Sequence, residues 1–160
     1  MTQKPKDLFD REEAETIAEE IYLTYLPFWK EIRIVGSIRR EKEKVHDIDI
    51  VMLPNDWIRL EAKIIKGNIK GIPFDIYIAN EKTFETLVLI RTGSAEHNQM
   101  LCKKAIEKGW KLKADGTGLV DKDGNIIDNT ERGILEKLLG RYVEPRDREV
   151  VQNGLKNFVK

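Results

Sequence analysis

The stretch DIDIVML, residues 47–53, constrains the fold of this chain more than any other. Apart from two aspartates it is apolar and rich in β-branched residues, which predicts a buried, central strand. Side chains two residues apart in a strand point to the same face, so Asp47 and Asp49 are expected side by side. Like charges at that spacing raise each other's pKa and gain nothing from burial. The strand therefore predicts a site that brings in positive charge.

A third carboxylate, Asp75, lies in a second apolar strand, IPFDIYIA, residues 72–79. Acidic oxygen donors on neighbouring strands are the ligands that Mg²⁺ prefers. Two such ions remove the repulsion between the carboxylates and can clamp the attacking and leaving oxygens of an in-line displacement. The alternative, two solvated aspartates on an exposed strand, is the usual interpretation of an isolated D-x-D. The apolar flanks and Asp75 favour a site for two metal ions and phosphoryl transfer.

Gly36-Ser37 lies upstream, between an expected strand over residues 32–35 and a brief helical turn through Arg40. A glycine lets backbone approach a ligand closely, and amides at a helix start together with a hydroxyl can bind a terminal phosphate. Arg39 and Arg40 can add bidentate phosphate contacts. For the two arginines alone, a solvated basic turn is the alternative.

Composition limits the partners and the compartment. The 160 residues suffice for one domain or two small subdomains. Lys and Arg balance Asp and Glu at 28 each, so polyanion binding must come from local patches. The single cysteine, Cys102, excludes an intramolecular disulfide and fits a reducing cytoplasm. We see no signal peptide and no run of the roughly 18 apolar residues that a membrane span needs, so a cytoplasmic protein is expected.

The periodicity predicts a sheet-rich first half and a second half of helices and small hairpins. Asp10 is expected to cap the first helix, with Glu13 completing a capping box. The expected helices cover residues 11–26, 83–91, 95–108 and a segment from 131 that ends at Gly140. The expected strands, besides 32–35 and 47–53, are hairpin arms over 62–66 and 72–79 joined through 67–71, and short strands within 111–120 and 121–128.

Three segments resemble known families. GSIRREKEKVHDIDIV resembles the glycine-serine signature of the nucleotidyltransferase superfamily. FDIYIANEKTFETLVLIRTGSAEHNQMLCKKAIEKGWKL looks like the palm-to-thumb passage of family X DNA polymerases, the polymerase beta family, and RYVEPRDRE is similar to their C-terminal element. The resemblance runs from Glu12 to Glu149. It implies an α+β fold with a nucleotidyltransferase-type mixed β-sheet palm and flanking helices, residues 1–81, followed by a small α/β thumb subdomain, residues 82–160.

The resemblance also implies roles for individual residues. Asp47 and Asp49 would bind two Mg²⁺ ions, for which Mn²⁺ can substitute. Asp75 would bind the catalytic ion and help to deprotonate the primer 3′-hydroxyl. The positions that match the nucleotide-binding motifs are Gly36, Ser37 and Arg40 at the triphosphate, Gly93 and Ser94 along the sugar, and Asn98 at the minor-groove edge of the base.

Residues 103–113 carry five lysines against one acid, Glu107. Alone this pattern indicates a solvated helix face, but with the motifs it predicts a patch that follows DNA phosphates. The residues expected to contact DNA are Lys103, Lys104 and Lys108.

The implied function is a monomeric DNA polymerase that adds deoxynucleotides to a primer 3′-hydroxyl, in primer-template or gapped DNA and in short-gap repair. The chain departs from the family in having one helix before its palm, Ile90-Arg91 in place of an aromatic pair, and Cys102 in place of a template-contacting arginine. The alternatives are a template-independent terminal or ribonucleotide-adding transferase, a non-catalytic DNA-binding relative, and a small-molecule nucleotidyltransferase.

Overall fold

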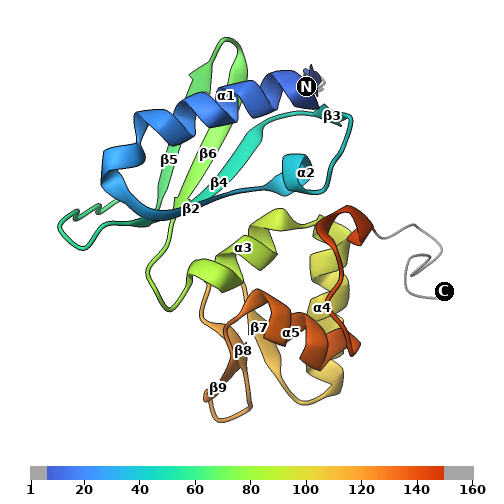
Figure 1. Ribbon diagram of the computed structural model, residues 1–160. Coiled ribbons are helices and arrows are strands. Elements are labelled where there is room, and N and C mark those ends of the chain that lie inside the picture. The colour runs from blue at the N-terminus through green and yellow to red at the C-terminus, as the bar shows by residue number, and fades with distance from the viewer. Residues whose placement is uncertain (1–6, 150–160) are drawn as a thin grey trace, which may run out of the picture.

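The computed structural model describes residues 7–149, so the last part of the predicted thumb segment, residues 150–160, lies outside it. Two sheets organise the chain (Figure 1). A four-stranded sheet in the order β2-β4-β6-β5 forms the first part, and a three-stranded sheet in the order β7-β8-β9 lies in the second, below it in this view. A short pair, β1 with β3, joins the N-terminal edge.

The first part contains, in chain order, β1 (Phe9–Asp10), α1 (Arg11–Thr24), the 3₁₀ turn η1 (Leu26–Phe28), β2 (Trp29–Val35), α2 (Gly36–Arg39), β3 (Lys44–Val45), β4 (Ile48–Pro54), β5 (Ile64–Ile69) and β6 (Ile72–Ile78). The second part contains α3 (Phe84–Thr92), α4 (Ala95–Glu107), β7 (Lys111–Lys113), β8 (Gly118–Val120), β9 (Ile126–Asp128), α5 (Glu131–Leu139) and the 3₁₀ turn η2 (Pro145–Asp147).

Strand β4 is an internal strand of the larger sheet, as its sequence predicts. It runs antiparallel to β2 and parallel to β6. Its two faces pack against different helices because side chains alternate along a strand. Ile48, Ile50 and Met52 lie in one core with α1, whereas Val51 and Leu53 lie in another with α3. The mixed α+β architecture expected from the sequence is confirmed.

The hairpin β5–β6 is tighter than the sequence suggested. Instead of a loop over residues 67–71, the strands pair as far as Ile69 and Ile72. Only Lys70 and Gly71 turn the chain, with φ of 53° and 87°. Positive φ at both positions is the geometry of a two-residue type I′ turn, whose twist matches that of the flanking strands. This shorter turn brings the β5 residues into register with Asp75.

The start of α1 differs from the expected capping box. Asp10 precedes the helix, but its side chain makes no capping hydrogen bond. Its carboxylate instead bonds the Lys44 ammonium, because β1 and β3 pair Asp10 with that residue. At the other end, α1 stops at Thr24, two residues before the predicted end, and Leu26–Phe28 form the 3₁₀ turn.

The second part has its own core. Buried side chains from α3, α4, α5 and the small sheet pack together, including Leu89, Leu101, Leu119, Ile134 and Leu135. Thr130 caps α5 by accepting a hydrogen bond from the Gly133 amide, and Gly140 ends this helix in the left-handed conformation. None of the helices within residues 7–149 has the length and apolar character needed to cross a membrane.

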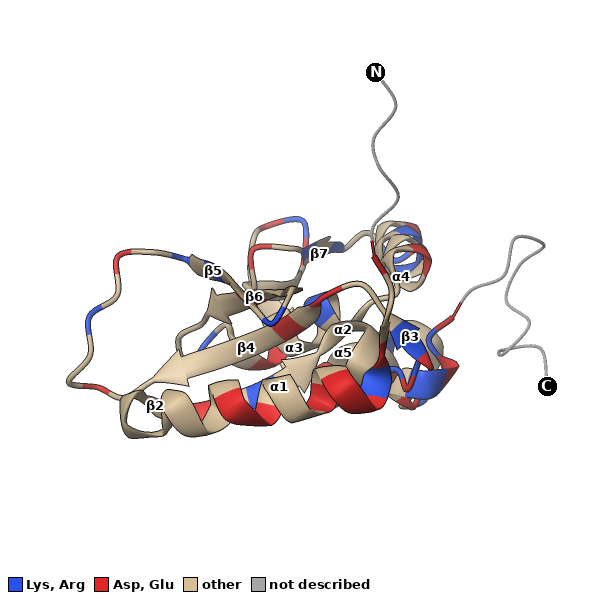
Figure 2. Ribbon diagram, turned by 90° about the horizontal axis from the view of Figure 1, so that it is seen from above, with Lys and Arg blue, Asp and Glu red and all other residues tan. Residues whose placement is uncertain are grey.

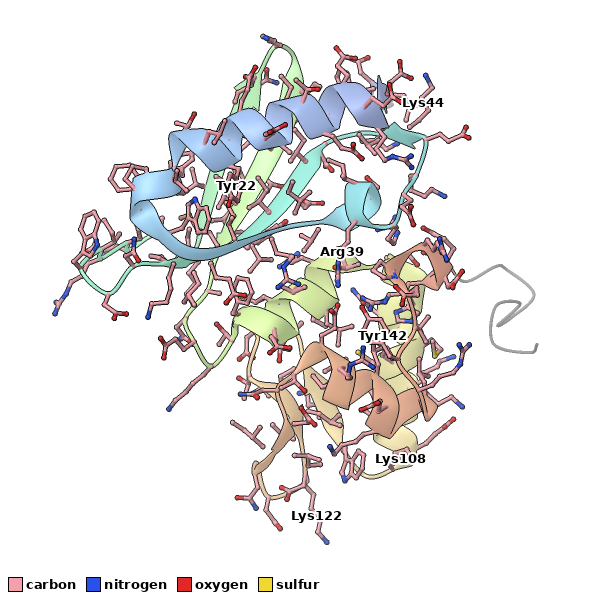
Figure 3. All side chains as sticks on the ribbon, viewed as in Figure 1. Tyr22, Arg39, Lys44, Lys108, Lys122 and Tyr142 are labelled. Atoms are coloured by element: carbon pink, nitrogen blue, oxygen red, sulfur yellow. The ribbon has the colours of Figure 1, made fainter. Side chains whose placement is uncertain are left out.

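A buried ion network joins the two parts. The Arg39 guanidinium, at the end of α2, donates to both carboxylate oxygens of Glu131 on α5, at 2.6 and 2.8 Å. Glu131 also accepts from Arg148 Nη1 at 2.8 Å, and the Arg148 side chain is fully buried. Figure 3 shows Arg39 reaching from α2 toward the helices of the second part. Burial opposes ionisation, but the bonds from Arg39 and the Arg148 charge lower the pKa of Glu131.

Candidate active site

The register of the larger sheet brings two of the three predicted carboxylates together. Asp49 on β4 lies directly opposite Asp75 on the parallel strand β6. Asp47 precedes β4 by one residue and lies two positions before Asp49. On the other side, Val35 at the end of β2 pairs with Asp49. Gly36 therefore begins α2 next to the carboxylates.

Gly36 is needed in this position for two physical reasons. Its φ of 65° lies in the left-handed region, which side chains rarely adopt. A Cβ atom at this residue would also lie 2.6 Å from Asp49 Oδ2. The backbone turn and the Asp49 carboxylate are thus in close contact, whereas phosphate binding by Gly36-Ser37 stays a prediction.

The carboxylate of Asp49 is held in an unfavourable place for a negative charge. Burial, and then the nearby charges of Asp47 and Asp75, raise its pKa from 3.8 to about 7. The charges of Arg91 and Arg40 act in the opposite direction but do not outweigh them. Near neutral pH, the Asp49 carboxyl group is therefore only partly ionised unless a cation stabilises its charged form.

The three aspartates fit divalent metal ions in ligand type and in backbone placement. They supply hard oxygen donors, and the raised pKa of Asp49 shows that they are gathered without full compensation by the arginines. As the side chains stand, however, no group of three or more His, Cys, Asp or Glu within residues 7–149 is arranged to hold a metal ion. The Asp75 side chain is bonded elsewhere.

Asp75 pairs with Lys66, a residue that the sequence did not single out. The Lys66 ammonium lies 3.1 Å from Asp75 Oδ1. The two residues are opposite each other in the β5–β6 ladder. Both line a cleft of about 670 Å³ that also includes Asp47.

The two arginines after Gly36-Ser37 have different partners. Arg39 is used in the network with Glu131, so the expectation that it contacts phosphate is wrong in this structure. Arg40 lies on the side of the carboxylates: its Nε donates to Glu149 at 2.7 Å, and its Nη1 donates to the Thr92 carbonyl at 2.7 Å. The Ser37 hydroxyl makes no hydrogen bond to another described residue and is half-buried.

The turn Gly93-Ser94 lies against Arg40. A Cβ atom on Gly93, whose φ is 72°, would lie 3.1 Å from Arg40 Nη1. The Ser94 side chain is buried and has a structural role: its hydroxyl donates to the Arg148 carbonyl at 2.9 Å and accepts from the His97 amide at 3.2 Å. The predicted nucleotide contact of this turn would therefore have to be made by its backbone and not by the Ser94 hydroxyl.

Asn98 lies on α4, four residues beyond this turn. Its amide donates to the Ile90 carbonyl at 2.8 Å, and its Oδ1 is buried without a hydrogen-bond partner in the described part of the chain. One amide N–H is thus already used. Contact of Asn98 with a base edge stays a prediction.

Arg91 stacks on Tyr77, with its guanidinium carbon 4.1 Å from the ring centroid. Tyr77 follows Asp75 by two residues on β6, so both side chains point to the same face of the sheet. Burial, and then the Asp49 charge, raise the pKa of the Tyr77 hydroxyl. Arg91 is an exposed cation whose charge acts on the Asp49 carboxylate.

The predicted DNA contacts lie on α4 and just after it. Lys103 and Lys108 are exposed, and Lys104 is half-buried with its ammonium 3.9 Å from Glu107. The Lys108 ammonium lies 5.8 Å from the centre of the Trp110 ring. Figure 3 places Lys108 at the end of α4 remote from α2. The structure thus leaves these lysines on the surface without testing their role.

Residues 87–149 match the family model for the DNA polymerase beta thumb. Two crystal structures of Leishmania infantum polymerase beta, a ternary P/T complex and a ternary gap complex, superpose with TM-scores of 0.72 and 0.72. The chain has a polymerase beta-like fold. Identities are 18% and 17%, and the alignments cover 89% of this chain and 77% and 71% of the other chains.

A search of curated protein sequences gave no significant match. The polymerase beta-like assignment therefore rests on the thumb model for the second part of the chain and on the structural similarity for the fold. It confirms the resemblance drawn from the motifs. The thumb match begins at Leu87, inside α3, the helix that packs on the four-stranded sheet as well as on the second core.

Proposed function

We propose that this chain is a metal-dependent DNA polymerase that extends a primer 3′-hydroxyl by nucleotidyl transfer, with short-gap repair as its role. The observation that carries the proposal is the direct pairing of Asp49 with Asp75 beside the Gly36 turn. A half-buried carboxyl group with a pKa of about 7 lowers the stability of the folded chain when it is ionised. Cation binding at this position would explain why the chain carries such a group.

Each residue then has a task. Asp47, Asp49 and Asp75 would hold two Mg²⁺ ions, with Mn²⁺ as a substitute. Bound there, the ions would supply positive charge to the attacking hydroxyl and to the phosphates. Gly36, Ser37 and Arg40 would hold the triphosphate. Gly93 and Ser94, through their backbone, and Asn98 would line the sugar and base.

The chemical step balances without any further reagent. The primer 3′-oxygen forms a bond to the α-phosphorus while the bond from that phosphorus to the β-phosphate oxygen breaks. The hydroxyl proton passes to the Asp75 carboxylate, and pyrophosphate leaves. The position of Asp75 on the wall of an open cleft supports this role.

The DNA itself would be bound by the lysines of the second part, Lys103, Lys104 and Lys108. The exposure of Lys103 and Lys108 supports this binding, and because the whole chain has no net charge, it would have to occur through a local patch. A monomer acting in the cytoplasm completes the proposal.

A terminal or ribonucleotide-adding transferase is the second candidate. It is favoured by Arg91, which stacks on Tyr77 at the position where an aromatic residue of the family screens the sugar. A planar cation leaves room and hydrogen-bond donors near that position. This candidate shares the carboxylates and differs in substrate.

Primer extension on gapped, nicked and single-stranded DNA, with Mg²⁺ or Mn²⁺, tests the proposal. Each deoxynucleotide and ribonucleotide is supplied separately. Template-directed addition of the complementary deoxynucleotide is expected. Addition without a template, or of ribonucleotides alone, would instead support the second candidate, and binding of gapped DNA without any extension would indicate a non-catalytic relative.

A further inference from the structure

Lys66 is the feature that the proposed function does not use. It lies within β5, and its Cα is opposite that of Asp75. Its ammonium lies 3.1 Å from Asp75 Oδ1, while the Lys66 side chain is 72% exposed and that of Asp75 is 22% exposed. A mobile, solvated cation thus sits on a carboxylate that the proposal assigns to metal binding.

The ammonium and a metal ion cannot share this carboxylate at low cost. Mg²⁺ binds carboxylate oxygens at about 2.0–2.1 Å and demands near-octahedral geometry. A lysine at hydrogen-bond distance takes up one lone-pair direction of the same group and repels the incoming dication. Because exposed ion pairs are weak and the lysine stem is flexible, Lys66 can yield to a metal ion.

The displaced ammonium stays beside a cleft that needs positive charge. The cleft of about 670 Å³ is lined by Asp47 and Asp75, and Lys66 is the one Lys or Arg among its described lining residues. The neighbouring residue Gly67 also lines the cleft, and the Phe74 ring fills the space that a side chain there would need, since a Cβ atom would lie 2.3 Å from the ring. A phosphodiester strand whose end lies at Asp75 in this cleft would therefore lie close to the Lys66 ammonium.

We propose that Lys66 is an exchangeable counter-ion, bonded to Asp75 in the metal-free chain and transferred to a phosphate of the acceptor strand when metal ions bind the carboxylates. The proposal rests on the proposed function for the identity of the strand. Metal binding and strand binding are thereby coupled through one side chain. Lys66 would prevent the cleft from holding uncompensated carboxylates before substrate arrives.

Metal binding without DNA tests the first half. Mn²⁺ binding to the whole protein is measured by electron paramagnetic resonance for the parent, Lys66→Met and Lys70→Met. Lys70 is the matched control, since it lies in the same hairpin, is 71% exposed and pairs with Glu20 at 3.6 Å. Loss of the competing cation is expected to tighten Mn²⁺ binding by about two- to five-fold in Lys66→Met alone. Unchanged or weaker Mn²⁺ binding by Lys66→Met would show that Lys66 does not compete with the metal ion for Asp75.

The salt dependence of DNA binding tests the second half. Affinity for primed DNA is measured over a range of salt with Mg²⁺ or with a chelator, and without nucleotide so that no extension occurs. With Mg²⁺, Lys66→Met should lower the slope of log affinity against log salt by about 0.7–0.9, the value for one lost phosphate contact. With the chelator, the slope should match that of the parent. Lys66→Arg should keep the parent slope in both conditions.

Other outcomes count against the exchange. If Lys66→Met lowers the salt slope equally with and without Mg²⁺, Lys66 contacts phosphate permanently. If it lowers the slope in neither condition, Lys66 does not contact the strand. If the parent itself does not bind primed DNA, the proposed function fails and the phosphate half fails with it. The Mn²⁺ measurement still decides the competition at Asp75.

Discussion

At the scale of single residues, the candidate site is built from groups that a stable fold alone would avoid. Asp49 has two carboxylate neighbours, Asp47 before it in the chain and Asp75 on the adjacent strand, and a glycine backbone lies against its oxygen. Strain and repulsion of this kind concentrate at functional sites. Two predictions separate this interpretation from an ordinary strand.

The first concerns the pH dependence of stability in the metal-free protein. The pKa of Asp49 is raised to about 7 in the folded chain from 3.8. The folded state therefore keeps a proton that the unfolded state releases, and the free energy of unfolding falls as pH rises through this window, by up to about 4 kcal/mol. Asp49→Asn should remove this decrease, so that its advantage over the parent grows from pH 4 and levels off above pH 7.

Denaturant unfolding with a chelator present, at several pH values, measures the effect. Asp56→Asn is the control, because the Asp56 side chain is 87% exposed. If the free energy of unfolding changes with pH in parallel for the parent and Asp49→Asn, the pKa of Asp49 is not raised in the folded chain.

The second prediction concerns Gly36. Alanine at this position would have to adopt a left-handed φ and place its Cβ atom 2.6 Å from Asp49 Oδ2. Gly71→Ala shares the positive φ, 87°, but has open space around it. Each variant should lose about 1–2 kcal/mol of stability from the backbone conformation, measured by denaturant unfolding. Only Gly36→Ala should also lose primer extension, and equal extension by both variants would argue against contact between the turn and the site.

At the scale of elements, the sequence predicted more of the sheet than of its contacts. Alternation in DIDIVML correctly predicted a largely buried strand that contains Asp49, since the periodicity of a buried strand is a local property, although Asp47 lies one residue before β4. The Lys66–Asp75 pair was missed because the hairpin turn was taken as five residues. Lys70-Gly71 as a two-residue turn would have set Lys66 opposite Asp75. Hairpin register depends on turn length, and a small error moves every cross-strand pair.

Contacts between elements that are distant in the sequence could not be predicted, because no local sequence pattern indicates them. Arg39 and Glu131 are 92 residues apart, and nothing near either residue identifies its partner. The sequence therefore assigned Arg39 to phosphate, whereas the structure uses it to join α2 to α5. Asp10 does precede α1 as predicted, but its side chain bonds Lys44 instead of capping the helix, because β1 and β3 pair these two residues.

The third prediction tests this junction. Glu131→Gln leaves two arginines, one of them fully buried, without a carboxylate partner. Breaking a buried ion pair costs about 3 kcal/mol or more, which lowers the Tm of a chain of this size by about 6–12 °C. Glu136→Gln on the same helix removes only an exposed contact of 4.0 Å with Arg132 and should change little. Equal Tm values for both variants, measured by calorimetry, would contradict a stabilising role for the network.

At the scale of the whole molecule, charge is divided between the two parts. Residues 1–81 carry more acidic than basic side chains and residues 82–160 the reverse, although the chain is balanced at 28 of each. Figure 2 shows acidic residues along α1, on the outer side of the larger sheet. The residues that match the thumb model are nearly neutral, with 12 Lys and Arg against 11 Asp and Glu in residues 87–149, so the proposed binding of a polyanion depends on local patches.

The central claim is that Asp49 and Asp75 perform nucleotidyl transfer. Single-nucleotide incorporation into gapped DNA under single-turnover conditions, compared for the parent, Asp49→Asn and Asp75→Asn, tests it most directly. Loss of a metal ligand should lower the rate by at least about 10³-fold while the folded state, followed by circular dichroism and Tm, is retained. Parent-like incorporation by either variant would contradict the account.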